Sequence, residues 1–112
     1  MRRAEERVRD MLLAIDGIER HTSEGRERFA RDDVLQGYVA YQLMVLGEAA
    51  YKMPRRLQSR YREIPWRQIS GLRHVLVHGY FAVDLDIVWG VVERDLPGLR
   101  EQLQRVLREI PG

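Results

Sequence analysis

The sequence predicts an all-α protein, an up-and-down bundle of four main helices with one or two short additional helices. Apolar residues recur at intervals of three and four along most of the chain, which is the period of helices packed on one face. No stretch alternates apolar and polar residues as a half-buried strand would. At 112 residues the chain has the length of one domain around one core, and we expect that domain to span residues 1–112.

The first main helix is expected over residues 3–20, and the segment after it is harder to assign. The buried positions of this helix are expected to be Val8, Met11, Leu12, Ile15 and Ile18. Residues 24–31 are mostly polar and could form either a loop or one short helix. His21 falls in this connection, and its surroundings in the sequence assign it no role.

The second main helix is predicted to begin after an N-cap at Asp32 or Asp33 and to run to about Lys52. Its apolar positions cover more than one face, so we expect it to lie at the centre of the bundle. These positions are Leu35, Tyr38, Val39, Leu43, Val45, Leu46, Ala49, Ala50 and Met53.

Near the end of that helix, small residues surround a carboxylate. Gly47, Ala49 and Ala50 would allow another backbone to approach closely, and Glu48 lies among them. A carboxylate on a tightly packed turn needs a partner, and Arg73 is the first candidate. We favour a structural contact for Glu48, with an auxiliary part in catalysis as the alternative.

The third main helix should follow Pro54, which ends the second helix, and a short basic turn over residues 55–61. Pro65 suits the first turn of this helix, and Trp66 can anchor it. We expect the helix to end at or just after His78, because Gly79 suits the left-handed turn that ends many helices.

The last main helix is predicted to start at Asp84, which suits an N-cap. Pro97 and Gly98 interrupt its apolar stripe without changing the phase, so we expect a kink there and one continuous helix. The expected buried positions are Val88, Val92, Leu96, Leu99, Leu103, Val106, Leu107 and Ile110.

Positive charge is concentrated in one part of the chain, although the net charge is only +2. Between Lys52 and His74 the single acid is Glu63. This stretch is either a solvated face or a path for a polyanion such as RNA, whose phosphates it would contact without reading sequence. The candidate RNA-binding residues are Arg55, Arg56, Arg60, Arg62 and Arg67.

The basic stretch leads into the segment with the richest chemistry, residues 71–80. It holds Arg73, two of the three histidines of the chain, His74 and His78, and Tyr80. On a straight helix Arg73 and His78 would point about 140° apart. A helix end, or a second copy of the chain, would be needed to bring both side chains to one target.

The remaining composition indicates the compartment. The chain has no cysteine, which excludes disulfides and thiol catalysis and fits a reducing environment. No apolar run approaches the ~20 residues of a membrane span, and the charged N-terminus is not followed by a signal core. We therefore expect a cytoplasmic protein.

The pattern Arg73, four residues, His78, Gly79 and Tyr80 resembles the Arg-x4-His-x-Tyr motif of HepT-like toxins, which belong to the HEPN ribonuclease superfamily. The similarity covers nearly the whole chain and is weakest over residues 20–33. Further similar segments are 46–50, 64–66, 69–73, 81–84 and 95–97. His74 departs from the family pattern, which usually has a small polar residue there, often asparagine.

The resemblance implies a HEPN-like bundle and a toxin of a toxin–antitoxin system that cleaves RNA without a metal or other cofactor, leaving 2′,3′-cyclic phosphate ends. It implies Arg73 and His78 as catalytic residues, and a homodimer whose two motifs face one cleft. It also implies a partner, a minimal nucleotidyltransferase antitoxin of the MntA type, which transfers AMP to Tyr80. His74 and Glu48 are possible auxiliary residues.

The chemistry of the side chains agrees with this assignment. Arg73 and His78 could instead only satisfy buried carbonyls at a helix end, and two alternative functions also stay open. An imidazole such as His78 suits general acid or base catalysis, and the guanidinium of Arg73 can hold two phosphate oxygens. One alternative is a metal site in which His74 and His78, four residues apart, share a helix face with Asp84 or Asp86. The other is a non-catalytic helical module that binds a nucleotidyltransferase or nucleic acid.

Overall fold

The structure, a computed structural model, describes residues 3–74 and 84–110, and these ranges are helical without any strand. The main elements are α1 (Ala4–His21), α3 (Asp33–Tyr51), α5 (Trp66–Gly71), α6 (Leu85–Gly90) and α7 (Leu96–Glu109). Two short helices, α2 (Arg26–Arg31) and α4 (Arg55–Arg60), lie between them. The expected all-α bundle with short additional helices is confirmed, and the two segments that were expected as a possible loop and as a basic turn are these short helices.

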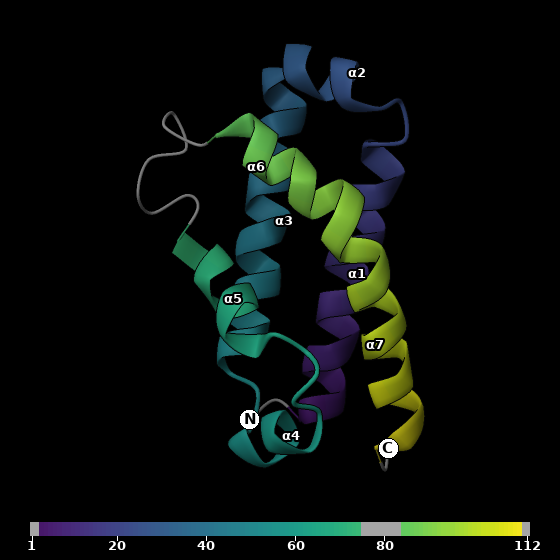
Figure 1. Cartoon of the computed structure of the whole chain (residues 1–112), viewed down its shortest axis with the longest axis vertical. Helices are drawn as coiled ribbons and strands as arrows, with labels where there is room; N and C mark the ends of the chain where they lie inside the picture. The colour runs from purple at the N-terminus through teal and green to yellow at the C-terminus, as the bar shows by residue number, and fades with distance from the viewer. Residues whose placement is uncertain (1–2, 75–83, 111–112) are drawn as a thin grey trace.

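Helix α3 lies at the centre, with α1 on one side and α5 on the other, and α7 packs along α1 (Figure 1). Its central place follows from its composition, because apolar residues on several faces must each be covered by a neighbour. Val39, Leu43, Leu46 and Ala50 are almost completely buried in the core. Within the described ranges, no helix combines the length and the apolarity of a membrane span.

Both predicted N-caps are present. The Asp32 carboxylate accepts a hydrogen bond from the Leu35 backbone N–H at 3.0 Å and so starts α3. The Asp84 carboxylate accepts from the backbone N–H groups of Asp86 and Ile87, at 2.9 and 3.3 Å, and so starts α6. Each cap satisfies N–H groups that have no partner inside the helix.

The C-terminal helical run is continuous, but its irregularity lies one turn before the predicted kink. Between α6 and α7 the backbone forms a π-helical turn, η3 (Val91–Asp95), and Pro97 occupies the first turn of α7. Proline lacks an N–H group and its ring crowds the carbonyl four residues earlier, so the adjustment falls on the preceding turn. The predicted kink at Pro97 and Gly98 is therefore displaced toward the N-terminus.

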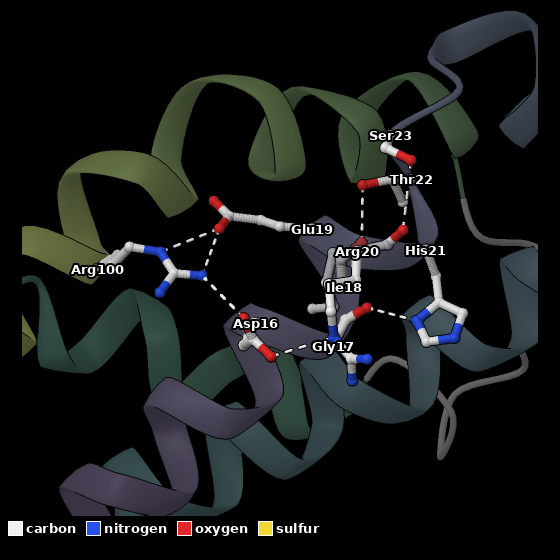
Figure 2. A network of polar contacts seen from close by, with 9 residues as sticks. All are labelled: Asp16, Gly17, Ile18, Glu19, Arg20, His21, Thr22, Ser23 and Arg100. Carbon is white, nitrogen blue, oxygen red and sulfur yellow. Dashed lines mark hydrogen bonds and ion pairs between the residues drawn. The ribbon is translucent and has the colours of Figure 1, made fainter.

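Polar contacts at the end of α1 fix its position against α7 (Figure 2). Arg100 of α7 donates through Nε to Glu19 at 3.0 Å and approaches Asp16 at 3.8 Å. Side chains at the end of α1 also bond to carbonyls of its last turns, since Nδ1–H of His21 donates to Gly17 O at 2.7 Å and Thr22 donates to Ile18 O at 2.8 Å. His21 thus has a structural part at a helix end.

Candidate active site

The candidate site is built on a place where two backbones meet. Helix α5 continues into a 3-10 turn, η1 (Leu72–His74), which crosses α3 at Gly47. A Cβ atom at Gly47 would lie 2.4 Å from the backbone N of Arg73 and 2.8 Å from Ile69 O. Only glycine allows this approach. The close backbone contact expected from the small residues of α3 is present, and it fixes the backbone of Arg73.

The guanidinium of Arg73 lies on an aromatic ring that the sequence did not single out. Its Cζ is 3.4 Å from the centroid of the Tyr51 ring, a stacked cation–π contact. Its Nε donates a long hydrogen bond, 3.4 Å, to Nε2 of His74. The available signal was spacing, because Tyr51 follows Gly47 by four residues and therefore shares its face of α3.

The prediction that Glu48 pairs with Arg73 is wrong. Its carboxylate pairs with Lys52 of the same helix at 3.3 Å, and 49% of its side chain is exposed. Because a helix turns by ~100° per residue, Glu48 is rotated away from the contact between Gly47 and η1, toward a hollow that Arg73 also borders. The carboxylate is solvated and has no need of Arg73.

Arg73 lies at the edge of a hollow of about 1000 Å³ between α4, α5 and the end of α3. Arg55, Arg62 and Arg67 line it together with Arg73, and no carboxylate is among its described lining residues. We call this the basic hollow. The structure thus brings the catalytic candidate Arg73 together with three of the predicted RNA-binding arginines.

The other two predicted RNA-binding arginines lie elsewhere. Arg56 and Arg60 line a separate hollow of about 490 Å³, which also includes Arg3 and Ile110. Helix α4 explains the division, because consecutive arginines on a helix project in different directions. The prediction treated the basic stretch as a single surface, whereas the fold divides it.

On its other side, Arg73 borders a second hollow of about 670 Å³. It is lined by Arg7 and Asp10 from α1 and by Glu48 and Lys52 from α3, and His74 lines both this hollow and the basic one. We call it the mixed hollow. Phosphates would be attracted to one side of Arg73 and would meet both signs of charge on the other.

The other predicted site residues, His78 and Tyr80, lie outside the described residues, as does the predicted end of the third helix. Of the possible metal ligands, Asp84 caps α6 and Asp86 pairs with Arg26. In residues 3–74 and 84–110, no group of three or more His, Asp or Glu side chains could hold a metal ion.

Comparison with known proteins agrees with the resemblance seen in the sequence. Residues 11–106 match the family described as ribonuclease HepT-like. A probable ribonuclease HepT of Thermococcus cleftensis is 34% identical, over 88% of this chain and 91% of that protein. A protein of Caldanaerobacter subterraneus, named a putative RNase, is 32% identical over 82% of each chain.

A third relative is longer. This protein of Methanocaldococcus jannaschii, named gamma-glutamylcyclotransferase and putative RNase, is 33% identical over 89% of this chain. The match spans only 46% of its own length. No solved structure gives a significant match.

Proposed function

We propose that this chain, which belongs to the ribonuclease HepT-like family, cleaves RNA without a metal ion and that Arg73 and His78 carry the reaction. The observation that supports this most directly is the basic hollow. Its arginines lead to Arg73, and no carboxylate among its described lining residues would repel a phosphate chain. A guanidinium at the end of such a path is placed to receive a phosphodiester.

In the proposed reaction, the imidazole of His78 takes the proton from a ribose 2′-hydroxyl, and the oxygen attacks the adjacent phosphorus. Arg73 donates hydrogen bonds to the phosphate oxygens while negative charge builds on them. The 5′-oxygen of the next nucleotide then leaves and takes up a proton. The products are a 2′,3′-cyclic phosphate end and a 5′-hydroxyl end.

We propose that the active form is a homodimer whose two motifs share one cleft. Two copies would supply two imidazoles, so that one acts as base while the other protonates the leaving oxygen. The mixed hollow supports this arrangement, because a surface with both signs of charge can pair with its own copy. His74 and Glu48, which both line it, then serve as auxiliary residues near the cleft and not as reacting groups.

Of the basic residues, we propose that Arg55, Arg62 and Arg67 bind the RNA backbone. They line the hollow that ends at Arg73, whereas Arg56 and Arg60 line a different one. Arginine suits this task, since its planar fork can contact two phosphate oxygens at once.

We further propose that the protein is the toxin of a toxin–antitoxin pair, controlled by a minimal nucleotidyltransferase that transfers AMP to Tyr80. The transfer joins the Tyr80 oxygen to the α-phosphorus of ATP and releases pyrophosphate. A bulky anion near Arg73 would occupy the cleft and offset its positive charge, so RNA would be excluded by size and charge together.

The cleavage proposal is tested with purified protein and a fluorescent RNA oligomer, beside Arg73→Ala and His78→Ala. We expect the parent to cut the oligomer in the presence of EDTA and to leave 2′,3′-cyclic phosphate ends. The cleavage rate of each variant should fall by about 100-fold or more, the usual loss when a general acid–base group or a donor to the transition state is removed. Equal cleavage by all three would indicate a contaminant, and RNA binding without cleavage would favour a non-catalytic binding module.

The modification proposal is tested by mass spectrometry of the chain co-expressed with a nucleotidyltransferase encoded beside it. We expect a single AMP adduct on Tyr80 in the inactive protein, and none in Tyr80→Phe. An inactive complex with unmodified Tyr80 would refute this part of the proposal and leave the cleavage chemistry unaffected.

A further inference from the structure

We propose that Tyr51 is a positioning residue of the active site, which holds the guanidinium of Arg73 so that its edge faces the basic hollow. This inference rests on the proposed function. Tyr51 is the last residue of α3, and it lines the basic hollow together with Arg73. Neither the sequence motif nor the family match assigns it a role.

The contact uses the part of the guanidinium that phosphate does not need. An aromatic ring attracts the flat face of an arginine, whereas phosphate oxygens accept hydrogen bonds from the N–H groups at its edge. With Cζ 3.4 Å from the Tyr51 centroid, one face is covered and the edge is left for hydrogen bonding. Nε points to His74, so the two terminal nitrogens are the ones that can hold a phosphate.

Helix α3 fixes Arg73 at two points on one face. Gly47 receives its backbone, and Tyr51, four residues further along, receives the end of its side chain. An arginine side chain loses roughly 2 kcal/mol of rotamer entropy when it is held in place. Because the stack holds the Arg73 side chain before RNA binds, part of this entropy has already been lost and does not add to the barrier of the reaction.

The exposure of Tyr51 argues against a role in the core alone. The residue is 56% exposed, far more than the buried Tyr61 at 1%. Tyr41, on the same helix, is 50% exposed, yet no arginine of the described residues stacks on it. Tyr41 therefore provides a matched control, an exposed tyrosine of α3 without the cation.

The first measurement is independent of activity. In NMR spectra of the arginine side chains, the Nε–H signal of Arg73, assigned by its loss in Arg73→Lys, should carry a ring-current shift from Tyr51. We expect Tyr51→Leu to move this signal to the position of an unstacked arginine and Tyr41→Leu to leave it in place. An Arg73 signal that does not respond to Tyr51→Leu would overturn the proposal, whether or not the protein cuts RNA.

The second measurement is cleavage of the RNA oligomer. We expect Tyr51→Leu to lower kcat roughly three- to tenfold, the factor that a cation–π contact of this type corresponds to, with a smaller change in KM. Tyr51→Phe, which keeps the ring, should recover most of that loss, and Tyr41→Leu should match the parent. In an Arg73→Lys background the Tyr51→Leu effect should shrink, because the planar group is absent.

The outcomes separate this inference from the proposed function. If Tyr51→Leu cuts RNA at the same rate as the parent, the positioning role is refuted and the ribonuclease proposal stays intact. A parent that binds RNA without cutting it refutes the ribonuclease proposal, and the catalytic use of Tyr51 falls with it. Equal unfolding temperatures for Tyr51→Leu and Tyr41→Leu would show that lost activity does not come from lost stability.

Discussion

Gly47→Ala is the sharpest test of how the helices hold Arg73. The added Cβ would lie 2.4 Å from Arg73 N, 2.8 Å from Ile69 O and 3.1 Å from the carbonyl carbon of Leu72, and all three are backbone atoms. Since backbone cannot swing aside as a side chain can, the α5–η1 segment must shift. Overpacking of this kind costs about 1–3 kcal/mol, and alanine regains up to ~1 kcal/mol of helix propensity. We expect a net loss of about 1–2 kcal/mol.

Urea unfolding measures this loss, and Gly37→Ala is its control. Gly37 lies in the same helix, and nothing lies within 4 Å of a Cβ built there, so its alanine should stabilise the protein by about 0.5–1 kcal/mol. RNA cleavage should fall in Gly47→Ala under conditions where the protein is fully folded, because Arg73 moves with η1. Equal stabilisation by both alanines, with cleavage unchanged, would refute the inferred close contact.

Three further predictions concern charge, pH and capping. Arg62→Gln should weaken binding of an RNA oligomer, and the slope of log K against log salt concentration should become shallower by about 0.7, the value for one phosphate contact. Arg56→Gln should change neither the affinity nor the slope. Binding titrations at several salt concentrations measure both quantities. The pKa of Glu109 lies below its ordinary 4.5, first because Tyr61 donates a hydrogen bond to it, so its stabilising contribution is present above that pH and is lost on acidification. Glu109→Gln should therefore make unfolding less dependent on pH below about 4.5, and an unchanged acid profile would contradict this. Asp84→Ala should cost about 1 kcal/mol in urea unfolding because two N–H groups lose their acceptor, and a neutral effect would show that the cap contributes nothing.

The features that the sequence predicted correctly are those set by local chemistry. Asp32 and Asp84 cap helices because a short carboxylate can reach the N–H groups of the following turn, whatever the rest of the fold does. Trp66 anchors α5 as expected, since it is buried and its indole N–H donates to Tyr61 O at 3.0 Å. Gly47 indicated a close approach of another backbone, because glycine inside a helix is less stabilising than alanine and is used where a side chain would not fit.

The features that sequence reasoning missed depend on how helices cross. The stack of Arg73 on Tyr51 requires the end of α3 to pass beneath η1, and no spacing along the chain specifies that crossing. The same holds for the separation of Arg56 from Arg62, which lie on different surfaces although they are close in sequence. A linear count of charge cannot distinguish such arrangements.

The single acid of the basic stretch shows how the fold makes the basic hollow more positive than composition alone would. Glu63 pairs with Arg105 of α7 at 3.0 Å, and Arg105 also holds Glu109, which accepts from the buried Tyr61. Glu63 is not among the described residues that line the basic hollow. The same contact that fastens the α4–α5 connection to α7 therefore removes the one local carboxylate from the path toward Arg73. Without the Glu63–Arg105 pair, the Glu63 carboxylate could compete with phosphate for the arginines of the basic hollow. The positive charge of the hollow therefore depends on this ion pair.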